Sequence, residues 1–61
     1  MQVYLVQAVY TDDEGTKTKS ILVVYKEGFN AHRMVELLQK NFKPNSEAIK
    51  AEYSVLAFEV L

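Results

Sequence analysis

Residues 9–16 read Val9-Tyr10-Thr11-Asp12-Asp13-Glu14-Gly15-Thr16, a turn between two runs of β-forming residues. Gly15 can take the left-handed conformation that closes a type I turn with a bulge, and acidic side chains favour the turn positions before it. The runs on either side, residues 2–11 and 17–26, are rich in β-branched, aromatic and aliphatic side chains and contain no strand breaker. The sequence therefore predicts a β-hairpin.

A helix is predicted after the hairpin, over about residues 31–42. Asn30 is a good N-cap, and Phe29 and Met34 have the spacing of a hydrophobic staple around it. Pro44 is expected to end the helix, because the residue before a proline avoids helical angles. One apolar stripe recurs at helical period and consists of Ala31, Met34, Val35, Leu38 and Phe42.

The rest of the chain completes a single domain over residues 1–61. Residues 53–60 read as a third strand. Residues 45–52 could be helix or strand, and a short helical turn capped by Ser46 is the favoured interpretation. A right-handed crossover then places the third strand beside the first. The predicted fold is α+β, a ββαβ unit with a three-stranded antiparallel sheet in the order 2-1-3 and one helix packed on one face.

Composition excludes several classes of function. The 61 residues include seven basic and eight acidic side chains, for a net charge of −1, so no basic excess indicates a nucleic-acid or anionic-membrane partner. The absence of cysteine removes disulfides and thiolate ligands, and one histidine cannot form a multi-histidine metal site. No signal peptide and no apolar run of roughly 20 residues is found, so a cytoplasmic protein with no membrane partner is expected.

Both faces of the predicted sheet are apolar, yet a single amphipathic helix can cover only one of them. If Asp12 pairs with Thr16, even-numbered residues of the hairpin share one face and odd-numbered residues share the other. The bulkier odd-numbered aliphatic set, with Leu56, Phe58 and Val60, is expected beneath the helix. The uncovered face is then predicted to carry Tyr4, Val6, Ala8, Tyr10, Leu22, Val24, Tyr53, Val55 and Ala57. An exposed apolar patch of this kind usually marks an interface, and we expect a homodimer formed through it.

No residue pattern indicates catalysis, a cofactor or a metal. His32 lies in the first helical turn with no orienting carboxylate in the local sequence, so a solvated surface residue is expected. Asp12, Asp13 and Glu14 lack the alternating ligand spacing of a calcium loop and are expected at a solvated turn. Nucleophile, phosphate-binding and paired-carboxylate motifs are absent, and the prediction is that the protein is not an enzyme.

The layout, a hairpin closed by the acidic turn Asp12-Asp13-Glu14-Gly15, then a helix and a strand, is similar to that of small phage-encoded inhibitors of uracil-DNA glycosylase. Those inhibitors are homodimers that mimic DNA, and the resemblance implies a phage or mobile-element origin. No functional residue of that family is assigned to this chain, because no functional motif matches and the chain lacks the acidic excess that DNA mimicry requires.

Two functions are therefore considered. The leading prediction is a small non-catalytic protein–protein interaction module or regulatory or inhibitory module that acts as a homodimer on an unknown protein partner. The resemblance adds the expectation of a phage or mobile-element protein. The alternative is a single-stranded nucleic-acid-binding protein that stacks bases on Tyr4, Tyr10 and Tyr53. A sheet face that stacks bases normally has basic side chains around its aromatic rings. This face lacks such a basic rim, so nucleic acid is the weaker expectation.

Overall fold

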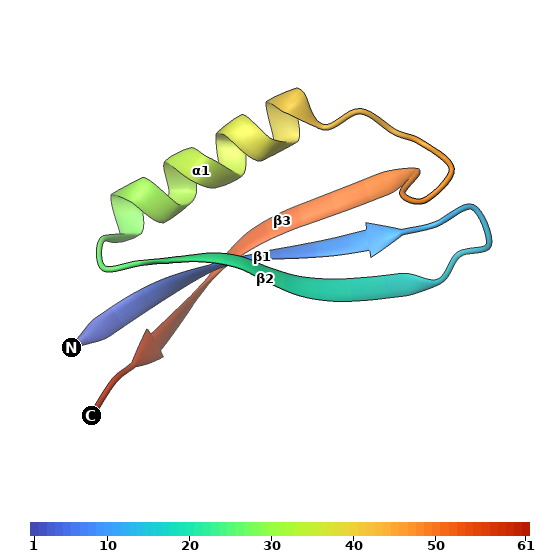
Figure 1. Cartoon of the computed structure of the whole chain (residues 1–61). Coiled ribbons are helices and arrows are strands. Elements are labelled where there is room, and N and C mark those ends of the chain that lie inside the picture. The colour runs from blue at the N-terminus through green and yellow to red at the C-terminus, as the bar shows by residue number, and fades with distance from the viewer.

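The chain folds as a three-stranded antiparallel sheet with one helix lying along one side (Figure 1). The computed structural model describes residues 1–61. The elements are β1 (Gln2–Thr11), β2 (Lys17–Tyr25), α1 (Gly28–Asn41) and β3 (Lys50–Glu59). The sheet order is β2-β1-β3, so the predicted α+β class, ββαβ order and sheet order are confirmed.

The hairpin turn is built as its residues predict. The Asp12 N–H donates to the Thr16 carbonyl oxygen at 3.0 Å, and the Gly15 N–H donates to the Asp12 carbonyl oxygen at 3.1 Å. Gly15 has a φ of 84°, in the left-handed region that a glycine enters without steric cost. The Asp12 carboxylate also accepts hydrogen bonds from the N–H groups of Glu14 and Thr16, at 2.9 and 2.8 Å. The Asp12 side chain therefore satisfies two backbone N–H groups of the turn.

A β-bulge changes the register in the middle of the hairpin. Near the turn the pairing is as predicted, with Tyr10 opposite Thr18 and Gln7 opposite Ile21. The register then shifts between Val6 and Gln7, so that Val6 pairs with Val23. Because side chains alternate strictly along a strand, one extra residue in β2 exchanges the faces of every β2 residue beyond it. The prediction that odd and even residues stay separated along the whole hairpin is wrong.

The helix covers the face of β1 that carries the even-numbered side chains. Val6 and Ala8 of β1 and Ala31 of α1 are fully buried. At the start of α1 the backbone lies against Tyr4, since a Cβ at Gly28 would be 3.2 Å from Tyr4 Cε1. Gly28, which has no side chain, lets the start of the helix approach the sheet closely. The expectation that α1 covers the odd-numbered set is therefore wrong.

The position of α1 is asymmetric across the sheet. It packs mainly against β3 and β1 and only weakly against β2 (Figure 1). Met34, Val35, Leu38 and Phe42 are half-buried along with fully buried Ala31, which confirms the predicted apolar stripe. The fold is consequently thin, with Cα extents of 39 × 22 × 11 Å, and only three of its 61 residues are fully buried.

The ends of the helix differ from the sequence expectation. α1 begins at Gly28, three positions early, with Glu27 at the N-cap in extended conformation and no side-chain capping bond. Asn30 therefore lies inside the helix, and Phe29 is 72% exposed, so neither the predicted cap nor the staple forms. At the other end, Phe42 already has extended backbone angles, two residues before Pro44.

The segment between α1 and β3 is a turn, and the expected short helix is absent. Asn45 and Ala48 exchange backbone hydrogen bonds of 3.0 and 3.2 Å. The Asn45 side-chain oxygen accepts from the N–H groups of Glu47 and Ala48, so Asn45, and not Ser46, satisfies this turn. Because the turn is short, β3 begins at Lys50, earlier than expected.

Candidate interaction surface

The face of the sheet opposite α1 has no covering layer and is largely apolar. Across it, Leu5 lies between Val24 and Leu56, and Val3 pairs with Phe58. Several of these side chains are strongly exposed, with Ile21 at 52%, Val24 at 53% and Phe58 at 51%. We call this surface the open face, and define its apolar part as Val3, Leu5, Val9, Ile21, Val24, Leu56 and Phe58.

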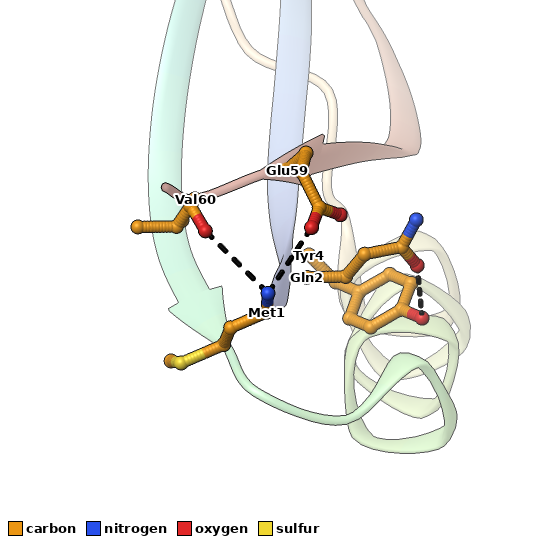
Figure 2. Close-up of polar contacts among 5 residues, drawn as sticks. All are labelled: Met1, Gln2, Tyr4, Glu59 and Val60. Carbon is orange, nitrogen blue, oxygen red and sulfur yellow. Dashed lines mark hydrogen bonds and ion pairs between the residues drawn. The ribbon is translucent and has the colours of Figure 1, made fainter.

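The open face continues to the end where the two chain termini meet. The Met1 ammonium group donates to Glu59 Oε1 at 3.1 Å and to the Val60 carbonyl oxygen at 3.4 Å. Figure 2 shows the Met1 and Val60 side chains pointing away from the helix, whereas Tyr4 and Gln2 lie on the helix side. Met1 and Val60 are 66% and 44% exposed, so they extend the apolar surface beyond Phe58.

Polar side chains on the open face gather towards the hairpin turn. Gln7 lies between Ile21 and Ser54, and the next row places Val9 between Lys19 on β2 and Glu52 on β3. Glu52 also forms an exposed ion pair with Lys50, at 3.1 Å. The surface thus has an apolar end near the termini and a charged end near the turn.

Seven of the nine residues predicted at the interface lie on the covered face. Val6 and Ala8 are fully buried and have no surface to offer a partner. Leu22, at the bulge, is 40% exposed, and Val24 points to the open face because of the bulge. The seven covered-face residues are Tyr4, Val6, Ala8, Tyr10, Tyr53, Val55 and Ala57.

The tyrosines of the covered face pack at the margins of the helix. Tyr10 and Tyr53 form a T-shaped pair with ring centroids 6.1 Å apart and an interplanar angle of 87°. The Tyr4 hydroxyl donates to Gln2 Oε1 at 3.1 Å (Figure 2). Burial raises the pKa of Tyr53 above its usual 10.0, and the neighbouring Tyr10 side chain adds to the shift. Half-buried rings with these partners do not form the free stacking platform that the nucleic-acid hypothesis requires.

His32 occupies an exposed position on the outer side of α1. With Phe29, Arg33 and Glu36 it lines a shallow hollow of about 350 Å³. The His32 imidazole forms no hydrogen bond with Glu36 or with any other side chain. This arrangement gives the imidazole no orienting partner.

Other chemical features add no site. No group of three or more His, Asp or Glu side chains is arranged to hold a metal ion. The carboxylate of Asp12 is occupied by the turn backbone. α1 lacks the length and hydropathy of a membrane-crossing helix.

Comparison of the chain with protein-family models, with curated proteins and with solved structures finds no match. Any function must therefore be inferred from the open face itself. Sequence reasoning named most members of the open face, but assigned them to the core beneath the helix. No signal in the sequence marks the bulge, because the run Ile21-Leu22-Val23-Val24-Tyr25 is apolar at every position and so does not fix a register.

Proposed function

We propose that this protein is a small non-catalytic interaction module that acts as a homodimer through its open face. The proposal rests on the total solvent-exposed area of the folded chain. The folded chain exposes 4649 Å², whereas the area–mass relation for folded monomers gives about 4,000 Å² for a mass of 7.0 kDa. The chain therefore exposes about 600 Å² more than an ordinary monomer of its size.

We attribute this excess to the open face. An antiparallel sheet with one solvated face normally alternates apolar and polar side chains, but β1 places Val3, Leu5 and Val9 on its uncovered side. Two copies that each bury an area equal to the excess would bury roughly 1,200 Å² in total, the lower end of the range for stable complexes. A dimer that dissociates at micromolar concentrations is the expected result.

Self-association also suits the limited core of the single chain. With three fully buried residues, one copy has little interior of its own. Stacking two open faces would create a helix–sheet–sheet–helix arrangement with a second apolar layer at its centre. Both helices would remain on the outside, where exposed Phe29 and Leu37 are free to contact a target protein.

Sedimentation equilibrium over a concentration series tests the proposal. Wild-type protein should change from monomer to dimer with rising concentration, and Val24→Glu should remain monomeric because it places a charge in the centre of the open face. Leu37→Glu is the matched control, since Leu37 is 47% exposed, like Val24 at 53%, but lies on α1. It should dimerise like the wild type. A wild-type chain that stays monomeric at high micromolar concentration would remove the proposal.

A further inference from the structure

We infer that the two copies stack with their central strands parallel, so that Lys19 on β2 of one copy pairs with Glu52 on β3 of the other. This inference rests on the homodimer proposed above and specifies its geometry. The partner surface is a second open face, and the two-fold axis runs along β1. Each dimer then contains two symmetry-related Lys19–Glu52 pairs, one at each edge of the interface.

The shape of the open face limits the possible arrangements. Three strands about 4.8 Å apart form a strip roughly 14 Å wide, and ten residues at about 3.3 Å each make β1 roughly 33 Å long. Two such strips overlap over most of their area only when their strands are aligned, as in sheet packings with an angle near 30°. An orthogonal crossing would leave the ends of both strips uncovered.

Two aligned arrangements have two-fold symmetry and differ in which rows meet. With the axis along β1, each cross-strand row lies over the same row of the other copy, and β2 faces β3. With the axis across the strands, the rows are reversed and β2 faces β2. Both arrangements bury the same open face but pair its side chains differently, and the polar side chains give the clearest distinction between them.

The charged row favours the first arrangement. Lys19, Val9 and Glu52 form one row, with the positive group at one edge and the negative group at the other. When this row lies over its own copy, each lysine meets a carboxylate across the roughly 10 Å that separates packed sheets. In the reversed arrangement at full overlap of β1, Glu52 would lie over the apolar rows of Leu56 and Phe58, where the second copy offers its carboxylate no partner.

The amide of Gln7 agrees with this choice. Gln7 is half-buried at the centre of the open face, between Ile21 and Ser54. With the axis along β1 it lies over the Gln7 of the second copy, and two amides can each donate and accept a hydrogen bond. In the reversed arrangement at full overlap of β1 it would lie between Leu5 and Gln7 of the second copy, so the two amides would no longer be directly opposed.

The last row before the turn lies at the solvent-exposed end of the overlap. It places Lys17 and Lys50 on either side of Thr11. Lys50 already pairs with Glu52 of its own chain, and water screens the charges at this end. This row therefore contributes little to the choice between the two arrangements.

A mixing experiment with charge-reversal variants tests the pairing. Lys19→Glu makes both interface charges of that chain negative, and Glu52→Lys makes both positive. Each variant alone should dimerise about tenfold more weakly than wild type, because two like-charged pairs replace two ion pairs. Mixed together, they restore opposite charges at both edges, so heterodimer should exceed the random-pairing ratio in native mass spectrometry.

The matched control separates local pairing from attraction by net charge. Lys43→Glu and Glu47→Lys make the same changes in net charge at exposed positions of the α1–β3 connection, away from the open face. Their mixture should pair close to randomly. An equal heterodimer preference in both mixtures, or no preference in the first, would overturn the parallel arrangement.

The outcomes also separate this inference from the homodimer itself. A wild-type chain with no dimer at any concentration defeats the proposed function. A wild-type dimer whose Lys19 and Glu52 variants show no preference for each other leaves the dimer in place and defeats only its parallel geometry. Circular dichroism checks that each variant folds. The milder variants Lys19→Gln and Glu52→Gln provide a second mixture, in which only the heterodimer keeps one ion pair.

Discussion

Gly15 is the one residue of the chain with a positive φ, 84°, and no atom lies within 4 Å of the position that a Cβ would take there. Gly15→Ala should therefore act through the backbone alone, because the left-handed conformation costs roughly 1–2 kcal/mol for an L-residue. Chemical denaturation should show a loss of about 1 kcal/mol, with Gly15→Asn less affected. An unchanged midpoint would mean that the turn adopts another conformation.

Asp12 stabilises the same turn through its side chain. One carboxylate oxygen accepts two backbone N–H groups, so Asp12→Ala should lower the free energy of unfolding by about 1–2 kcal/mol. Asp13→Ala is the control, since Asp13 is exposed at the adjacent position and holds no such bonds, and it should change stability by less than about 0.5 kcal/mol. Equal effects would show that the acidic character of the turn matters more than the Asp12 contacts.

Tyr53 gives the fold a dependence on alkaline pH. Burial and the adjacent Tyr10 raise the pKa of Tyr53 above 10.0, so folding favours the neutral phenol. The resulting stability is complete below about pH 10 and is lost as the pH rises through the folded-state pKa. Between about pH 9 and pH 11 the wild type should therefore lose more stability than Tyr53→Phe, as measured by denaturant unfolding. Parallel losses in the two proteins would contradict the raised pKa.

At the scale of the elements, the close approach of α1 to the sheet depends on small buried residues. Ala31 is fully buried against a sheet centre that includes Ala8. Ala31→Leu should lift the helix and cost about 1–3 kcal/mol by overpacking. Gln39→Leu adds the same side chain at an exposed helical position, where the effect should stay within about 0.5 kcal/mol. A tolerated leucine at position 31 would show that the helix–sheet contact is loose.

The hairpin and the stripe of α1 were predictable from local chemistry, and the sheet order was predictable from the right-handed crossover. Gly15 specifies the turn, and apolar residues at helical spacing specify the buried side of α1. The start of α1 was missed because Gly28 enters the helix with no side-chain cap, so the cap signal of Asn30 was misleading. The connection was missed because Asn45 forms the turn that Ser46 was expected to cap as helix.

The face covered by the helix could not be read from hydrophobicity, because both faces of the sheet are apolar. Volume favoured the aliphatic odd-numbered side chains, but the helix packs where Ala8 and Ala31 allow close approach. Tyrosines suit the margin of this contact, since the ring covers apolar surface and the hydroxyl remains near water, as at Tyr4. The bulge then moves Val24 to the open face and Val23 to the covered one, an exchange that an uninterrupted apolar run does not signal.

At the scale of the whole molecule, the proposed homodimer predicts that the stability of this thin helix–sheet layer depends on association. If the open face is buried in the dimer, the dimer is the more stable folded form, and mass action should raise the unfolding temperature as protein concentration rises. Thermal unfolding followed by circular dichroism over a hundredfold concentration range should show this rise for wild type and for Leu37→Glu. Val24→Glu should unfold at a lower temperature that does not vary with concentration, because its open face no longer associates. A wild-type unfolding temperature independent of concentration would mean that the single helix–sheet layer, with only Val6, Ala8 and Ala31 fully buried, is sufficient by itself.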